Sequence, residues 1–234
     1  MNVYIENVFK EYNGRRVLDI DKLTLEKGKV YAVLGLNGSG KSALLECIAG
    51  LQQPDGGRIL YDNNLTLDLI SNKISMMTQK PYLFNKTVLE NIMSGLEYRK
   101  IPKLAIKERV EQYLDYLDID ELLNKNAKKL SGGEAAKTAL LRTAVLETNL
   151  TILDEPTASM DMESTLRAEK LIKDMAKKDR TVVFVTHDLY QAQRIANEVV
   201  FMDRGRILEQ GSKNAVFTNP QSSLLKMMLN QKVG

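Results

Sequence analysis

The chain has 234 residues, of which 44% are hydrophobic and 27% are charged, so it can bury the core of one globular domain. A formal net charge of +3 with both signs interspersed argues against a nucleic-acid-binding surface, and the single cysteine, Cys47, excludes an intramolecular disulfide or a multi-cysteine metal site. No apolar run approaches the length of a membrane span and the first residues lack a signal-peptide pattern, so we expect a cytosolic protein that meets a membrane only through a partner.

Two stretches near the start, residues 3–9 and 17–26, alternate polar and apolar side chains on either side of the turn Tyr12-Asn13-Gly14. Alternation with a period of two around a turn predicts antiparallel strands. Lys27-Gly28-Lys29 then turns the chain into an apolar run, residues 30–34, which we expect to be a buried strand.

Directly after that run, residues 35–42 fit the pattern G-x-x-x-x-G-K-[ST]. Residues without bulky side chains let backbone N–H groups approach a phosphate chain, and the helix expected over 43–50 adds the positive end of its dipole. Lys41 would reach the β- and γ-phosphates, and the Ser42 hydroxyl would ligate Mg²⁺. The alternative, a plain glycine-rich turn, is disfavoured by the strand before and the helix after. The predicted phosphate cradle comprises Gly35, Leu36, Asn37, Gly38, Ser39, Gly40, Lys41 and Ser42.

Beyond this helix the pattern changes from strands to helices. Short strands are expected over 58–61 and 73–78, the second ending at Gln79. From Pro81 to about Leu130 the apolar residues recur at helical spacing. A strand-helix-strand crossover does not need so many residues, so we predict a mainly helical lobe inserted into an α/β domain.

The lobe ends in Ser131-Gly132-Gly133-Glu134, followed by a helix through about Glu147. Two glycines before a helix make a second anion site by the same physics as the first. Taken alone, the same residues are an ordinary helix cap. The spacing from the first loop does not decide between the two interpretations.

An apolar strand over 150–153 runs into Asp154-Glu155-Pro156. In a chain with a phosphate loop, one such carboxylate reaches Mg²⁺ and the second polarises the attacking water. The alternative is an acidic turn that is stopped by the proline.

The last third of the chain predicts a helix over 163–178, a β-branched strand over 181–186, a hairpin over 198–210 and a terminal helix from Lys213. His187, the only histidine, follows the strand. Open α/β sheets bind ligands at the carboxyl ends of their strands, which favours a functional over a structural role for this side chain.

Together these segments resemble the ATP-binding subunit of ABC transporters over nearly the whole chain. The family's motifs occur in order: the aromatic A-loop (Tyr12), Walker A (35–42), the Q-loop glutamine (Gln79), a helical subdomain, the signature (130–134), Walker B through Asp154 with Glu155 beside it, the D-loop (158–161) and the switch histidine (His187).

The resemblance implies an α/β fold, a P-loop NTPase of ABC type. We expect a single domain over 1–234, with a RecA-like core and an antiparallel β subdomain from 1–80 and 150–234, and an α-helical subdomain with the signature helix over 81–149. It also implies roles: Tyr12 stacks on adenine, Gln79 senses Mg²⁺ or the attacking water, Asp154 holds the metal, Glu155 is the general base, and His187 contacts the γ-phosphate.

For the second glycine turn, the resemblance favours the anion site over the plain cap. Ser131, Gly132, Gly133 and Glu134 would bind the γ-phosphate of ATP held by another copy, and Asp161 would cross the interface. The expected assembly is a head-to-tail homodimer that encloses two ATP molecules with Mg²⁺. Permease subunits would dock on the helical subdomain and Q-loop at the cytoplasmic face of the membrane, with a solute-binding protein as an indirect partner.

The resemblance is to importers rather than exporters. Fused exporters usually carry T-x-V-G-E-x-G before the signature, where this chain has Asn124-Lys125-Asn126-Ala127-Lys128-Lys129. Residues 82–92 are similar to the Q-loop regions of bacterial importers, and the sequence as a whole resembles tungstate, molybdate or phosphate uptake subunits. The alternatives are an exporter-energising subunit, a non-transport ABC ATPase, an inactive nucleotide-binding module and a soluble P-loop kinase.

Several positions depart from the family pattern. Ala43, at the edge of the predicted cradle, replaces a threonine, and Glu134 replaces the commoner glutamine. The helix after the signature keeps only the charge of Lys137 from the usual glutamine-arginine pair, and Thr151 interrupts the Walker B apolar run. None of these is a predicted catalytic position, so an active ATPase is expected.

Overall fold

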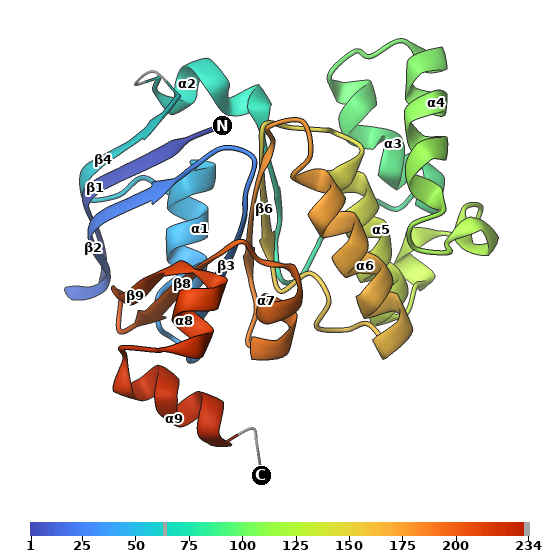
Figure 1. Ribbon diagram of the computed structural model, residues 1–234. Coiled ribbons are helices and arrows are strands. Elements are labelled where there is room, and N and C mark those ends of the chain that lie inside the picture. Colours follow the sequence, from blue (N-terminus) through green and yellow to red (C-terminus); the bar gives the residue numbers. More distant parts are fainter. Residues whose placement is uncertain (63–64, 232–234) are drawn as a thin grey trace.

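The computed structural model describes residues 1–62 and 65–231, which form two β-sheets with helices between and around them (Figure 1). Among these residues, no helix combines the length and the apolar character needed to cross a membrane.

The smaller sheet is antiparallel, with strand order β2-β1-β4. The turn between β1 and β2 contains Asn13 and Gly14 with φ of 49° and 75°, the left-handed pair that a two-residue hairpin requires. One face is apolar, as the alternation predicts, because Val3, Ile5 and Val8 are fully buried. The strands are β1 (Val3–Tyr12), β2 (Arg15–Leu25) and β4 (Gly56–Tyr61).

The larger sheet has the order β5-β6-β7-β3-β8-β9, with parallel pairing except for the last strand. Its central strands are buried along their whole length because layers cover both faces, which explains their continuous apolar runs. Parallel pairing brings their carboxyl ends to one edge. The strands are β3 (Val30–Gly35), β5 (Ile74–Met77), β6 (Leu150–Asp154), β7 (Thr181–Val185), β8 (Glu198–Asp203) and β9 (Arg206–Ser212).

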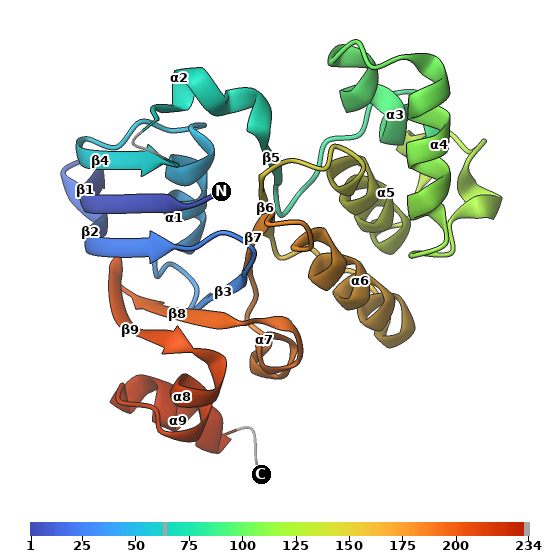
Figure 2. The ribbon, with the colours of Figure 1, turned by 45° about the horizontal axis from the view of Figure 1, so that its top comes forward.

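Helices fill the space on each side of this sheet. The helix α1 (Lys41–Ala49) lies between the two sheets, where Leu44, Leu45 and Ile48 join their shared core (Figure 2). The opposite face carries α6 (Met162–Met175), α7 (Leu189–Ile195) and α8 (Lys213–Thr218), and a short α2 (Leu67–Ile70) precedes β5.

Three helices stand apart from the smaller sheet, on the other side of the molecule (Figures 1 and 2). They are α3 (Val88–Tyr98), α4 (Lys103–Leu114) and α5 (Gly132–Ala144), of which α3 and α5 pack closely together. This helical lobe is inserted in sequence between β5 and β6.

The predicted single terminal helix is wrong. The chain forms α8 and a separate α9 (Ser223–Gln231). Pro220 separates them because proline lacks an N–H and disfavours a helical residue before it. The Glu209 carboxylate accepts hydrogen bonds from the backbone N–H groups of Gln221 and Ser222, so the break is held in place. Residues 232–234 of the predicted helix lie outside the described part of the chain.

Two further helices end earlier than predicted. The helix expected to reach Lys178 ends at Met175, because Lys178 and Asp179 adopt left-handed φ of 59° and 61°. The helix expected to reach Glu147 ends at Ala144, and Glu147 itself has φ of 49°.

Candidate functional site

The phosphate loop, residues 35–42, connects the carboxyl end of β3 to the first turn of α1. The Lys41 ammonium is buried at its centre and donates to the carbonyls of Gly35 and Leu36, each at 2.9 Å. Burial lowers the pKa of Lys41 from its usual value, with Glu155 and Asp154 opposing that shift. A single buried cation is therefore held under a loop of small residues.

The back of this loop rests on other parts of the chain. The Gly205 N–H donates to the Ser39 carbonyl at 2.9 Å, and the Asp19 N–H donates to the Gly205 carbonyl at 2.8 Å. A Cβ on Gly40 would lie 2.6 Å from the Val17 carbonyl oxygen, so only glycine allows this approach. The turn between β8 and β9 thus braces the phosphate loop, a contact that sequence reasoning did not find.

A cavity of about 480 Å³ opens in front of the loop. Most of the predicted cradle lines it, together with residues from the carboxyl ends of β5, β6 and β7. Gly35 and Leu36 contribute through their carbonyls to Lys41 instead. The lining residues are Tyr12, Val17, Asn37, Gly38, Ser39, Gly40, Lys41, Ser42, Ala43, Gln79, Asp154, Glu155 and Val185.

Asp154 ends β6 inside this cavity and is only 6% exposed. Its Oδ2 accepts a hydrogen bond from the Ser42 hydroxyl at 2.9 Å. Burial raises the pKa of Asp154 from its usual value, and the Ser42 hydroxyl opposes the rise. A carboxylate and a hydroxyl in contact offer the hard oxygen donors that suit Mg²⁺, which takes few protein ligands and completes its shell with phosphate and water.

Glu155 adopts a left-handed φ of 48° directly before Pro156, a combination that both its own Cβ and the proline disfavour. Its N–H donates to the Val185 carbonyl at 3.1 Å, which holds the turn on the neighbouring strand. Backbone strain of this kind persists where surrounding contacts fix it, and it is concentrated at functional sites.

The Glu155 carboxylate pairs with His187, whose Nδ1 lies 3.0 Å from Oε2. The two residues are 32 positions apart and come from the ends of adjacent strands β6 and β7. The histidine side chain is 66% exposed, whereas the glutamate is 13% exposed. Glu155 lines the phosphate cavity, whereas His187 is absent from its lining and its imidazole is largely exposed.

Tyr12 stands at the cavity rim with 42% of its surface exposed. Its hydroxyl hydrogen-bonds the Gln52 side chain, which in turn donates to Glu46 at 2.7 Å. These contacts orient the ring at the edge of the phosphate cavity. Sequence reasoning missed Gln52 because no motif marks it.

The signature turn, residues 131–134, caps α5 and lies away from the phosphate cavity of its own chain. The Ser131 N–H donates to Glu134 at 2.6 Å and Lys125 binds the same carboxylate at 3.0 Å, which together lower the pKa of Glu134 to about 2. A Cβ on Gly133 would lie 2.9 Å from the Ser159 carbonyl oxygen, so the turn packs on the D-loop segment. Asp161 caps α6 by accepting from the Ser164 N–H.

Thr151, which interrupts the apolar Walker B run, has a structural explanation. Its hydroxyl lies 3.2 Å from that of Thr148 and 3.5 Å from that of Ser75, all three residues being buried. These hydroxyl groups join β5 to β6 at the end of the sheet opposite the site. The departure therefore leaves Asp154 in place.

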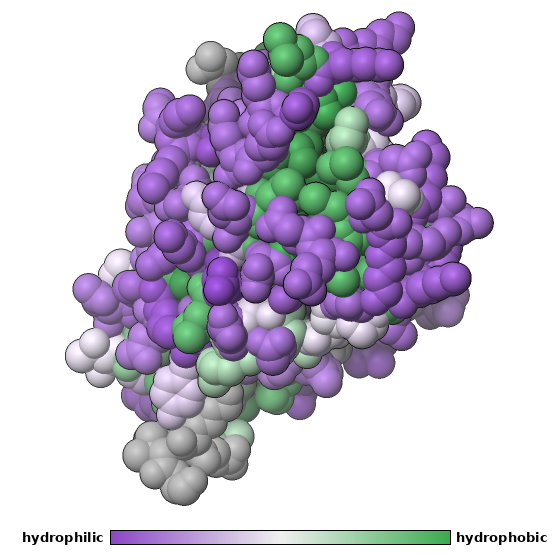
Figure 3. Space-filling view, turned by 90° about the vertical axis from the view of Figure 1, so that its right-hand side faces the viewer, coloured by the Kyte–Doolittle hydropathy of each residue, from purple (hydrophilic) through white to green (hydrophobic). Residues whose placement is uncertain are grey.

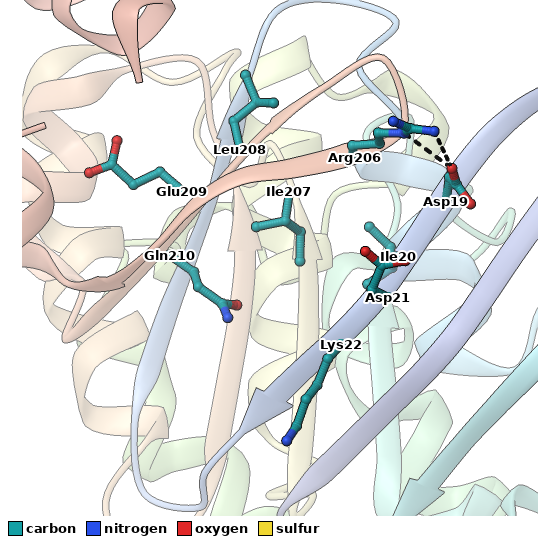
Figure 4. A pocket seen from close by; sticks show the side chains of 9 residues that line it. All are labelled: Asp19, Ile20, Asp21, Lys22, Arg206, Ile207, Leu208, Glu209 and Gln210. Atoms are coloured by element: carbon teal, nitrogen blue, oxygen red, sulfur yellow. Dashed lines mark hydrogen bonds and ion pairs between the residues drawn. The ribbon is translucent and has the colours of Figure 1, made fainter. Parts of the chain in front are cut away.

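A second concavity of about 380 Å³ lies between β2 and β9 (Figure 4). On one side Asp19 pairs with Arg206 at 2.8 Å and with Arg16 at 3.0 Å. Its charged lining residues carry both signs, and none of the predicted site residues lies on it. The phosphate loop cavity remains the candidate site.

Comparisons with known proteins agree with this geometry. The sequence model of the ABC transporter family matches residues 18–158. The tungstate uptake system ATP-binding protein TupC of Peptoclostridium acidaminophilum is 37% identical over 210 residues, covering 89% of this chain and 98% of that protein. The glutamine transport ATP-binding protein GlnQ of Geobacillus stearothermophilus is 32% identical, covering 98% of both chains. The dimeric structure of MJ0796, a bacterial ABC transporter cassette, matches with a TM-score of 0.82 and 25% identity, over 90% of this chain and 98% of that one.

Proposed function

The chain belongs to the ABC transporter family and is an ATP-hydrolysing enzyme, and from this premise we propose that it energises the uptake of a small solute through a separate membrane permease. The observation that carries the proposal is the convergence of three groups on one cavity: the phosphate loop, the Ser42–Asp154 pair, and Glu155, whose carboxylate is hydrogen-bonded to His187 beside the cavity.

ATP binding is assigned to the phosphate loop and Tyr12. The triphosphate lies along the backbone N–H groups of residues 35–42, and Lys41 exchanges its loop carbonyls for phosphate oxygens. The Tyr12 ring, at the rim of the cavity, stacks on adenine with little base selectivity because any flat ring offers a π-face.

A magnesium ion suits the Ser42 and Asp154 oxygens, with Gln79 on the same cavity wall. When bound there, it neutralises charge on the phosphate oxygens and orients them for in-line attack. Among residues 1–62 and 65–231, no three histidine, cysteine, aspartate or glutamate side chains are grouped so that they could hold a metal ion. Mg²⁺ commonly takes one or two carboxylates and completes its shell with substrate phosphates and water.

Hydrolysis is assigned to Glu155 and His187. The Glu155 carboxylate accepts the proton of the attacking water, and His187, paired with it at 3.0 Å, holds the water and contacts the γ-phosphate. The left-handed turn at Glu155 directs the carboxylate to the cavity rather than to bulk solvent.

The active assembly is a head-to-tail homodimer. One copy supplies the phosphate loop, but its Ser131, Gly132 and Gly133 lie outside its own cavity. In a head-to-tail arrangement these N–H groups close the cavity of the second copy and exclude water from the γ-phosphate. Hydrolysis removes the bridging charge, so the interface opens, and this motion is relayed to the permease.

The permease docks on the helical lobe from the cytoplasmic side of the membrane. Apolar side chains gather in a band on the face of the molecule that Figure 3 shows. In the helical lobe, Leu104 of α4 is 71% exposed. Tyr82 and Phe84, within five residues of Gln79 in the sequence, are also exposed and pack edge to face at 5.8 Å between ring centres. An exposed apolar surface next to Gln79 is suited to transmit the nucleotide state to a partner.

The transported solute is an oxyanion such as tungstate, molybdate or phosphate. The support is the 37% identity to a tungstate uptake subunit over 98% of that protein. Glutamine transport by another relative shows that this part of the sequence serves several solute classes. The chain can be co-purified with its permease and tested in uptake assays with labelled tungstate and labelled glutamine. Uptake of tungstate but not glutamine would support an oxyanion as the solute, and the reverse would contradict it.

The experiment that tests the function is Glu155→Gln. We expect this variant to bind ATP, to lose hydrolysis and to accumulate as a dimer on gel filtration with ATP. An ATP-bound monomer would contradict the sandwich, and unchanged hydrolysis would contradict the role of Glu155. A soluble kinase would instead transfer phosphate to an acceptor, and an inactive module would show no effect of the substitution.

A further inference from the structure

We propose that Gln191 is a positioning residue for hydrolysis, which fixes the turn carrying Glu155 against the helix that follows His187. The proposal rests on the roles assigned above to Glu155 and His187. No motif in the sequence marks Gln191, and its importance follows from its contacts.

Gln191 lies on α7 and is 1% exposed. Its amide Nε2 donates to the Thr157 hydroxyl at 2.8 Å. Thr157 follows Glu155 by two residues in the same turn, which is closed by a hydrogen bond from the Ala158 N–H to the Glu155 carbonyl. Gln191 follows His187 by four residues. One hydrogen bond therefore ties together the two segments whose side chains meet in the Glu155–His187 pair.

The orientation of the Gln191 amide is fixed by a third segment. Nε2 lies 3.4 Å from Oε1 of Glu169 on α6, which is buried and held by two hydrogen bonds from Arg194 at 2.9 and 2.6 Å. A carboxylate only accepts hydrogen bonds, so the amide nitrogen must face it. The Gln191 oxygen consequently points away from Glu169.

That oxygen, Oε1, is a buried acceptor with no protein partner in the described chain. Gln191 lines a polar cavity of about 180 Å³, which also has Glu155, Thr157 and His187 in its wall. Glu155 is the one described residue that lines both this cavity and the phosphate cavity. An unpaired buried acceptor is costly, so the orientation of the amide is set by the contacts of Nε2 with Thr157 and Glu169 and not by its oxygen.

Loss of this link would change the reaction and spare substrate binding. Thr157 and Gln191 line the cavity behind Glu155 and are absent from the wall of the phosphate cavity. A displacement of reacting groups by about 1 Å costs about 100-fold in rate. We therefore expect the effect in kcat rather than in KM.

The first test is Gln191→Leu, with Gln193→Leu as a matched control because Gln193 is an exposed glutamine on the same helix. Steady-state ATPase assays should show kcat lower by about 10- to 100-fold in Gln191→Leu, with KM for ATP within about twofold of wild type. The control should match wild type. A kcat equal to the control, or a higher KM with normal kcat, would overturn the proposal.

The second test is a double-mutant cycle with Thr157→Val, which removes one hydroxyl from a half-buried residue. If the Gln191–Thr157 bond carries the effect, the double variant should be no slower than Gln191→Leu alone. Additive losses would contradict it. Should Gln191→Leu fail to fold, Thr157→Val alone decides, since a normal kcat there refutes the link.

The outcome is separable from the proposed function. Full activity in Glu155→Gln would show that Glu155 is not the general base, and the proposed role of Gln191 would then have no basis. If Glu155→Gln is inactive and, in a separate assay, Gln191→Leu has the same kcat as Gln193→Leu, the ATPase mechanism stands and only the positioning role of Gln191 is refuted.

Discussion

The phosphate loop and the signature turn are both glycine-rich segments that begin a helix, yet their surroundings differ. The phosphate loop is braced from behind by Gly205 and encloses a buried lysine. In the signature turn the serine and glutamate cap each other, and Ser131 and Gly132 are exposed. The first segment lines a cavity in its own chain, whereas residues 131–134 line none of the cavities described above for residues 1–62 and 65–231. The difference supports the proposal that the second segment acts on a ligand held by another copy.

The largest effect should come from the phosphate loop. Lys41→Ala removes the only cation within it, and we expect hydrolysis to fall by at least about 100- to 1,000-fold, the cost of losing one charge aimed at developing negative charge. The exposed Lys170→Ala on α6 is the control and should retain activity. ATPase assays and nucleotide titration would measure both, and unchanged activity in Lys41→Ala would exclude the loop as the site.

Ser131→Ala should weaken activity without weakening ATP binding to the monomer. Loss of one hydrogen bond to a charged group corresponds to about a 10- to 100-fold fall in turnover. The same change removes a helix cap and should cost about 1 kcal/mol of stability. Filter binding at low protein concentration, where dimers are scarce, should give the wild-type affinity for ATP. A weaker affinity there would place the signature turn in its own chain's site.

The brace behind the phosphate loop is tested by Gly205→Ala, with Gly14→Ala as its match. Both glycines are left-handed, with φ of 82° and 75°, but a Cβ on Gly205 would lie 2.7 Å from the Val17 carbonyl oxygen, whereas one on Gly14 meets nothing within 4 Å. Gly14→Ala should cost about 1 kcal/mol, and Gly205→Ala about 2–4 kcal/mol with a raised KM for ATP. Thermal unfolding and kinetics measure each, and equal effects would contradict the brace.

The smallest effect concerns the cap of the signature turn. The folded pKa of Glu134 is about 2, below its ordinary value of 4.5. Its stabilising effect is therefore complete above about pH 4.5 and is lost as the pH falls toward 2. The free energies of unfolding of wild type and Glu134→Gln should differ most near neutral pH, by less than about 1 kcal/mol. Their melting temperatures should converge in acid. A difference that grows in acid would refute the cap.

The sequence predicted the ABC-type α/β fold, and the family match confirms it. The short patterns around the phosphate loop and the Asp154-Glu155 pair were readable because the chemistry of each lies within a few consecutive residues. The different surroundings of the two glycine-rich segments could not be predicted, because a helix cap and an anion site have the same residues at Ser131. Only the surroundings in space distinguish a braced loop from an exposed one.

Contacts between distant segments account for most of what the sequence did not predict. Glu155 meets His187 across adjacent strands, and Gly205 reaches Ser39 from the far end of the chain. The left-handed turn at Glu155 is fixed by a neighbouring strand, so local propensity gives no sign of it. By contrast, the break between α8 and α9 has a local cause in the sequence, because Pro220 cannot continue a helix.

The central claim is that two copies complete each other's phosphate sites. Specific ATPase activity, measured over a dilution series of the purified chain at saturating ATP and Mg²⁺, tests this most directly. The account predicts that activity per molecule rises with protein concentration to a plateau and that Ser131→Ala lowers it. Activity per molecule that stays constant on dilution and is unaffected by Ser131→Ala would contradict the account.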